Sequence, residues 1–183
     1  MERYINTPLT DEVINELSIG DYVYITGTIY TARDAAHKRM CETIANNEQL
    51  PIDVKDNIIY YMGPSPAREG KAIGSAGPTT ATRMDKYAPE LLDLGLKGMI
   101  GKGKRQAPVV ESMIKNNAVY FAAIGGAGAI LSKCIEESEV VAYDDLGTEA
   151  IRKLKVKNFP VIVVIDSKGN DLYKTSILKY CKE

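Results

Sequence analysis

The chain has 183 residues, of which 45% are hydrophobic and 26% are charged, and this composition favours a domain with a sizeable core. Its 23 basic and 24 acidic residues leave a net charge of -1, which argues against the global basic field that attracts nucleic acid. Residues 1–7 lack the apolar core of a signal peptide and no apolar run approaches the ~20 residues of a membrane span, so we expect a cytoplasmic protein without a membrane segment.

The first half of the chain predicts helices placed between strands. Thr10, followed by two acidic residues, is typical of a helix cap, and Gly20 is expected to end that helix. The β-branched and aromatic residues of 21–30 predict a strand. Further along we expect a helix over 32–47, a strand over 57–62, a long loop over 63–71 and a short strand over 72–75.

The second half alternates more regularly between strands and helices. We expect helices over 88–93, 108–115, 127–137 and 148–155, strands over 98–101, 118–124 and 160–165, an apolar segment over 140–143, and a hairpin-like turn over 166–170. Continuous apolar strands that are each followed by a helix imply strands buried on both faces. Without a repeat or a linker, the chain is therefore predicted to form a layered α/β domain.

Three cysteines, Cys41, Cys134 and Cys181, lie far apart and form no CxxC or similar pair. An odd number of cysteines argues against a closed disulfide framework. Iron–sulfur clusters usually take several ligands from one short cysteine-rich loop, and this spacing does not provide one. We therefore expect reduced thiols that behave as small hydrophobic side chains, and no metal site on this chain.

Two segments combine threonines with an arginine near a predicted helix start. Residues 77–85 contain a Gly-Pro turn, three threonines and Arg83, and residues 26–37 run from a strand end through threonines to Arg33. Free N–H groups at a helix start and the arginine fork both suit a carboxylate or phosphate. Together the two arginines predict a site for a dianionic ligand.

Two glycine-rich segments approach nucleotide-binding motifs but fail in detail. In 125–131, counting from Gly126 places Leu131 where a dinucleotide-binding turn requires glycine or alanine, so close helix–strand packing is favoured. In 98–105, Arg105 stands where a P-loop needs serine or threonine. The remaining feature of this segment is Lys102, which lies between two glycines and suits either an anion site or a solvated basic turn.

His37 is the only histidine, so this chain alone cannot build a Ser-His-Asp triad or a multi-histidine zinc site. An orienting or structural role suits it better than acid–base chemistry. Threonine hydroxyls are too weakly acidic to act as bases without help from neighbouring groups.

Several segments carry a family resemblance: Thr31 to Arg39, Gly63-Pro64, Gly74 to Thr80, Arg83-Met84, Ile100 to Gly103 and Tyr143 to Ala150. Through them the chain resembles the β subunit of class I iron–sulfur fumarate hydratases and L(+)-tartrate dehydratases over nearly its whole length. The resemblance implies a swivelling β/β/α fold, with residues 1–183 forming a single domain. It also implies a [4Fe–4S] cluster held by a separate α subunit, an active site shared by the two chains, and a dimer of αβ units.

The resemblance also implies roles for particular residues. Arg33, Arg83 and Lys102 match the family's carboxylate-binding residues, and Thr79 matches the threonine proposed as catalytic base. We assign supporting roles to Asp34, His37 and Thr80. The expected activity is reversible hydration of fumarate to malate, without turnover by this chain alone. Three alternatives stay open: a tartrate dehydratase β subunit, a non-catalytic carboxylate-binding domain and a nucleotide-binding α/β protein.

Overall fold

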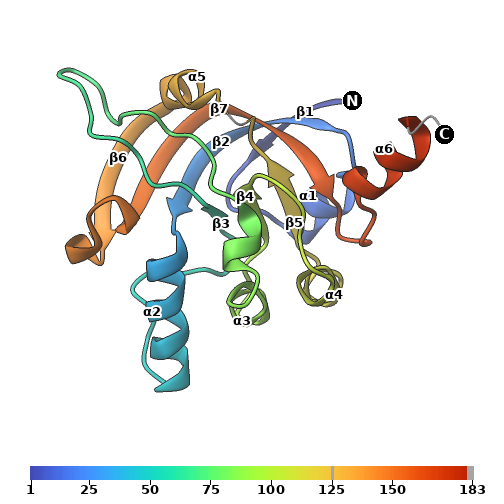
Figure 1. Ribbon diagram of the computed structural model, residues 1–183, viewed down its shortest axis with the longest axis horizontal. Coiled ribbons are helices and arrows are strands. Elements are labelled where there is room, and N and C mark those ends of the chain that lie inside the picture. Colours follow the sequence, from blue (N-terminus) through green and yellow to red (C-terminus); the bar gives the residue numbers. More distant parts are fainter. Residues whose placement is uncertain (125, 181–183) are drawn as a thin grey trace.

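A seven-stranded sheet forms the framework of the computed structural model, which describes residues 1–124 and 126–180 (Figure 1). The strands are β1 (Glu2–Asn6), β2 (Tyr22–Thr31), β3 (Ile58–Tyr60), β4 (Gly98–Gly101), β5 (Val119–Ala122), β6 (Ile135–Ala142) and β7 (Ile151–Ile165). The α-helices are α1 (Asp11–Asn15), α2 (Asp34–Ala45), α3 (Ala88–Asp93), α4 (Ala107–Lys115), α5 (Gly128–Leu131) and α6 (Leu172–Tyr180). Shorter 3₁₀ helices are η1 (Ala81–Met84), η2 (Ser132–Cys134) and η3 (Asp144–Glu149).

The two longest strands, β2 and β7, pair antiparallel along most of their length. On its other edge β2 pairs in parallel first with β1 and then, at its carboxyl end, with β3. The strands β3, β4 and β5 continue in parallel, and β5 pairs with β7, so the sheet curls back on itself. Beyond this ring, β6 pairs antiparallel with β7.

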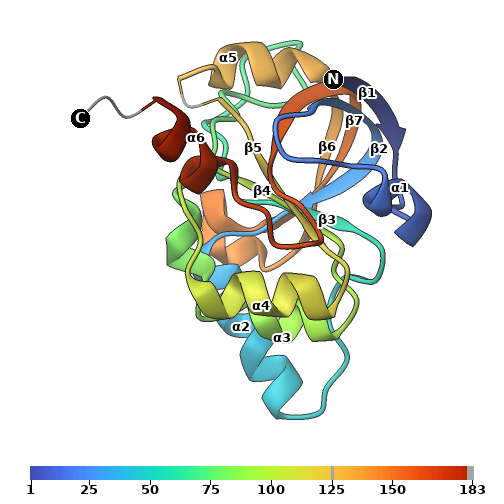
Figure 2. The same cartoon turned by 90° about the vertical axis from the view of Figure 1, so that its right-hand side faces the viewer.

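The curled sheet and its helices form three layers with two cores. Alternate residues of β3 show this, because Ile58 and Tyr60 belong to the core shared with β2 and β7, whereas Ile59 belongs to the core beneath the helices. In β4, Ile100 likewise belongs to the core shared with β2 and β7, and Met99 to the core beneath the helices. The helices α2, α3 and α4 lie together on one side of the sheet (Figure 2). The predicted layered α/β architecture is confirmed, with β3 to β5 buried on both faces.

Three predicted elements are wrong. The helix expected over 127–137 ends at Leu131 and is followed by η2 and β6. The helix expected over 148–155 is the end of η3 and the start of β7, because pairing with β2 and β6 outweighs local helix propensity. Residues 72–75 form a loop rather than a strand, and Gly74 lies against the backbone of Ser65 and Pro66.

The remaining predicted elements are confirmed with shifted ends. The hydroxyl of Thr10 accepts a hydrogen bond from the backbone of Val13, as expected of a helix cap, although α1 ends before Gly20. Among the described residues, no helix combines the length and the apolarity needed to cross a bilayer.

Candidate active site

The candidate site lies at the edge of the sheet where three parallel strands end. Because β2, β3 and β4 run parallel as neighbours, their carboxyl ends face the same side. Arg33 follows β2, Tyr61 follows β3 and Lys102 follows β4. In both open and closed parallel α/β sheets, ligands bind outside such carboxyl ends. The topology therefore gathers segments that are far apart in sequence.

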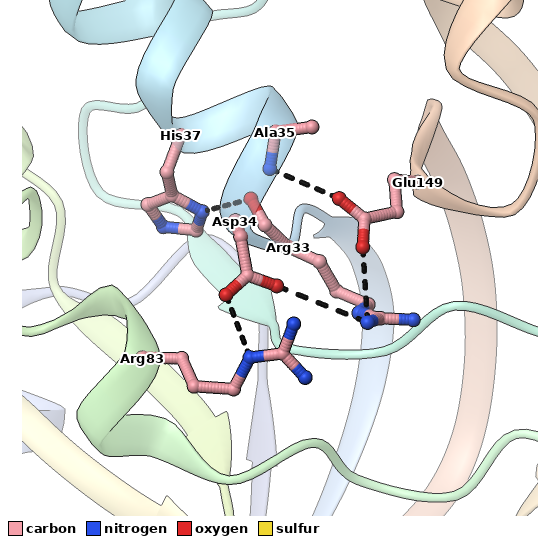
Figure 3. Close-up of polar contacts among 6 residues, drawn as sticks. All are labelled: Arg33, Asp34, Ala35, His37, Arg83 and Glu149. Atoms are coloured by element: carbon pink, nitrogen blue, oxygen red, sulfur yellow. Dashed lines mark hydrogen bonds and ion pairs between the residues drawn. The ribbon is translucent and has the colours of Figure 1, made fainter.

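Arg33 is held at the start of α2 by a carboxylate from η3 (Figure 3). Its Nη2 lies 2.9 Å from Oε1 of Glu149, and its side chain is only 21% exposed. The other oxygen of Glu149 accepts a hydrogen bond from the backbone N–H of Ala35 at 3.0 Å. Glu149 thus binds both a terminal nitrogen of the guanidinium and a free N–H of the helix start.

Asp34 links the two arginine-bearing segments. Its Oδ1 accepts a hydrogen bond from Nε of Arg83 at 2.7 Å, and its Oδ2 lies 3.8 Å from Nη2 of Arg33. Figure 3 shows this carboxylate between the two guanidinium groups. Because Asp34 accepts from Nε alone, it does not engage the two terminal nitrogens of Arg83. Those nitrogens retain the fork that binds a carboxylate through two hydrogen bonds.

Both helix-start predictions need correction. The N–H of Ala35 at the start of α2 already binds the protein's own Glu149. Arg83 lies near the end of the four-residue η1, and its backbone N–H donates to the carbonyl of Thr80 at 3.4 Å. An anion at this edge would therefore meet side-chain cations rather than a free helix terminus.

Backbone hydrogen bonds fix Thr79 beside Lys102. The N–H of Thr79 donates to the carbonyl of Tyr61 at 2.7 Å, and the N–H of Lys102 donates to the carbonyl of Thr79 at 3.2 Å. The carbonyl of Lys102 in turn accepts from Ala81 at 2.9 Å. Thr79 is half-buried, whereas Thr80 and Lys102 are exposed and pair as a short parallel bridge. The segment before η1 thus extends the edge of β4.

Two glycines allow these segments to approach closely. A Cβ atom at Gly63 would lie 2.7 Å from the carbonyl oxygen of Thr148 and 3.0 Å from Nη1 of Arg33. At Gly101, a Cβ atom would lie 2.9 Å from the ring of Tyr61. Larger residues would force the arginine or the tyrosine to move.

The charges of this cluster are nearly balanced. Arg33, Arg83 and Lys102 carry three positive charges, and Asp34 and Glu149 carry two negative charges, which leaves one net positive charge. A dicarboxylate would meet two arginines already oriented by protein carboxylates. The arrangement therefore suits a small dianion whose position must be defined.

His37 supports the start of α2 from beneath. It is fully buried, and its Nδ1 lies 2.9 Å from the carbonyl oxygen of Arg33, so this nitrogen carries the proton and donates. Burial lowers the pKa of His37 from 6.5 to about 4, despite the opposing effect of this hydrogen bond. The ring is thus neutral at physiological pH and positions the backbone of Arg33. The arrangement agrees with the orienting or structural interpretation.

Sequence reasoning gave no separate role to Glu149. The residue lies within the Tyr143–Ala150 segment of the family resemblance, but it is 114 positions from Ala35 and no local spacing connects them. Arg105, which spoils the P-loop pattern, is a buried partner of Asp85. Gly128 lies against the backbone of Gly77, so close packing explains this glycine, whereas Gly125 lies outside the described residues.

The described cysteines do not form a metal centre. Cys41 lies on α2 and Cys134 on η2, whereas Cys181 lies outside the described residues. Burial raises the pKa of the Cys41 thiol to about 12, which disfavours the thiolate that binds iron. Within residues 1–124 and 126–180, no three His, Cys, Asp or Glu side chains are grouped to hold a metal ion. This part of the chain does not fit an iron–sulfur cluster.

A hollow of the surface lies elsewhere. It has a volume of about 530 Å³ and is formed between the loop over 65–75, α5 and the start of β6. Arg33, Arg83 and Lys102 do not line it. The candidate site is instead defined by the segments that meet at the strand ends.

Comparison with known proteins gives a family match over almost the whole chain. The family model described as "Fumarase C-terminus" matches residues 2–176. The aerobic class I fumarate hydratase of Escherichia coli (strain K12) is 40% identical over 182 residues, which cover 97% of this chain and 33% of that protein. Fumarate hydratase 2 of Leishmania major is 40% identical over 172 residues, which cover 91% of this chain and 30% of that protein.

A relative of similar size is also found. The putative L(+)-tartrate dehydratase subunit beta of Methanocaldococcus jannaschii is 37% identical over 178 residues. The match covers 94% of this chain and 91% of that subunit. The chain therefore spans about a third of the length of the fumarate hydratases and nearly all of a protein named as a separate β subunit.

Proposed function

The chain belongs to the Fumarase C-terminus family, and from this premise we propose that it is the β subunit of a two-chain iron–sulfur hydro-lyase. Its substrate pair is fumarate and malate, interconverted by reversible addition of water. The observation that carries this proposal is the convergence of Arg33, Arg83 and Lys102 at one sheet edge, with Asp34 between the arginines.

Fumarate presents a carboxylate at each end of a short rigid carbon chain. Cations from three different segments can hold both ends and select one orientation of the double bond. Asp34 and Glu149 hold the two arginines in place, so less order must be imposed when substrate binds. The cluster thus supplies binding and orientation.

Thr79 is the proposed acid–base group. Hydration places a proton on one carbon and a hydroxyl on the other, and the Thr79 hydroxyl would transfer the carbon-bound proton. A threonine needs a nearby positive charge to favour its ionised form. Arg33 is the proposed source of this charge. The N–H of Thr79 donates to the carbonyl of Tyr61, and Gly63, two residues further along, contacts the side chain of Arg33.

The cluster and the partner chain belong to the same proposal. The described residues offer no suitable ligand set, so the [4Fe–4S] cluster is assigned to an α subunit. The fumarate hydratases that match are about three times as long as the match, so each of them has room for a cluster-bearing region outside it. We expect a dimer of αβ units, no turnover by this chain alone, and a cytoplasmic location.

The second candidate is the β subunit of an L(+)-tartrate dehydratase. It is favoured by the matching relative of nearly equal length that carries this name. Tartrate has the same two carboxylates, so the same cations would serve either substrate. Discrimination would depend on contacts to the additional hydroxyl groups.

The test is an anaerobic assay of this chain alone and of the chain co-purified with its α partner. Fumarate and L(+)-tartrate are supplied in parallel. We expect consumption of fumarate only by the pair. A preference for tartrate would establish the second candidate, and inactivity on both substrates with an intact cluster would refute the hydro-lyase proposal in favour of a carboxylate-binding domain.

A further inference from the structure

A buried ion pair lies directly behind the candidate site. Nε of Arg105 donates to Oδ1 of Asp85 at 2.6 Å, and the two side chains are 0% and 2% exposed. Transferring both charges out of water is costly, so such a pair is weak evidence for a stabilising role. The proposed reaction does not use either group, and another reason for the pair is needed.

The pair joins the two segments that carry exposed cations of the candidate site. Asp85 lies two positions after Arg83, and Arg105 lies three positions after Lys102. Oδ2 of Asp85 also accepts a hydrogen bond from the backbone N–H of Gln106 at 2.8 Å. One carboxylate therefore binds both the side chain and the backbone of the segment that follows β4.

The guanidinium of Arg105 also contacts a tyrosine that follows β3 and a tyrosine within β5. Its Cζ lies 5.4 Å from the ring centre of Tyr61 and 5.1 Å from that of Tyr120. Tyr61 provides the carbonyl that binds Thr79, and the hydroxyl of Tyr120 donates to the carbonyl of Gly103 at 3.0 Å. Arg105 thus fills the space beneath the loop that presents Lys102.

We propose that Asp85 and Arg105 are positioning residues, which fix the spacing between Arg83 and Lys102 for a dicarboxylate substrate. This inference rests on the proposed function. A small displacement of either cation would weaken its hydrogen bonds to a rigid dianion. The effect is expected mainly on substrate binding, because neither buried group touches the reacting atoms.

The test variant replaces both charges together, D85N/R105M, in the complex with the α partner. Asparagine keeps an oxygen for the N–H of Gln106, and methionine is a long side chain whose sulfur can contact the tyrosine rings in place of the guanidinium. D21N is the matched control, since Asp21 is also buried but precedes β2, away from the strand ends that carry the site. A single R105K variant, which keeps the charge, is the alternative if the double variant does not fold.

Two readouts separate positioning from folding. Hydrogen exchange of the Lys102 and Ala81 amides, which bond across the two segments, should become faster in D85N/R105M and stay unchanged in D21N. KM for fumarate should rise on the order of tenfold while kcat changes by a few-fold at most. In R105K the rise in KM should be smaller than in the double variant, since the ion pair is kept.

Three outcomes would overturn the inference: unchanged exchange at both amides, faster exchange with an unchanged KM, or an equal rise of KM in D21N. A K102A variant tests the proposed function separately. If K102A raises KM and the double variant does not, only the positioning role fails. If K102A itself leaves both KM and kcat unchanged, the proposed role of Lys102 in substrate binding fails.

Discussion

At the scale of residues, two carboxylates organise the arginines of the site. The pair between Asp34 and Arg83 is partly exposed, with side-chain exposures of 28% and 49%, so it contributes little to stability. Its consequence is orientation, because Nε of Arg83 faces the protein and the terminal nitrogens stay available to a ligand. Glu149 also holds Arg33 in place, but it does so by binding a terminal nitrogen of that guanidinium, Nη2.

Thr79→Val and Thr79→Ser test the proposed proton transfer. Both keep the backbone hydrogen bonds to Tyr61 and Lys102, and only serine keeps a hydroxyl. We expect the valine variant to lose roughly two to four orders of magnitude in kcat, the usual contribution of acid–base catalysis, with little change in KM. Serine should retain much of the activity. Steady-state kinetics of the αβ complex decides, and equal kcat values for the two variants would contradict the assignment.

His37 predicts a characteristic loss of stability in acid. Its pKa is near 6.5 when solvated and about 4 when buried, so below pH 6.5 the unfolded chain binds a proton that the folded chain does not. Stability should therefore fall as the pH decreases from about 6.5 to about 4, by on the order of 3 kcal/mol.

The matched variant is His37→Asn, whose amide can still donate to the carbonyl of Arg33 without titrating. Urea unfolding between pH 4.5 and 6.5 should show a flatter dependence in the variant than in the wild type. Parallel dependences would mean that the histidine does not cause the acid sensitivity.

At the scale of elements, η3 and α2 stabilise each other through Glu149. Glu149→Ala removes the acceptor for the Ala35 N–H, and we expect a loss of about 1 kcal/mol in unfolding free energy, as for a helix cap. Glu149→Gln, which keeps an acceptor but no charge, should lose less.

Urea unfolding measures both losses. Glu137→Ala is the control, because this exposed partner of Lys155 does not contact a helix start, and its stability should scarcely change. A loss in Glu149→Ala no larger than in the control would show that the contact is not a cap.

Elements with a local apolar pattern could be predicted from the sequence. The helices α3 and α4 and the strand β4 lie where their patterns placed them, because each buries its own alternating or helical set of side chains. The strand β7 was missed over 151–155, since its pairing with β2 and β6 is non-local. Pro160 has no N–H to donate, yet β7 tolerates it. On the edge of β7 that faces away from β2, Pro160 lies between the residues that pair with β6 and those that pair with β5.

At the scale of the whole molecule, the parallel topology explains the position of the site. Strands β2, β3 and β4 bring Arg33, Thr79 and Lys102 to one edge although up to 69 positions separate them. The candidate residues came from family-specific segments, whereas the contacts that hold them could not be predicted. Glu149 and the Asp85–Arg105 pair depend on long-range packing that leaves no local signal.

The most direct test of the central claim is kcat/KM for fumarate with Arg83→Ala in the αβ complex. Lys115→Ala is the control, since this exposed lysine pairs with Asp93 away from the strand ends. Losing a charge-assisted bidentate contact should lower kcat/KM roughly a hundredfold for Arg83→Ala, while the thermal stability of this variant stays unchanged. Lys115→Ala should keep the wild-type kcat/KM. Equal kcat/KM for the two variants would contradict the claim that this edge binds the substrate.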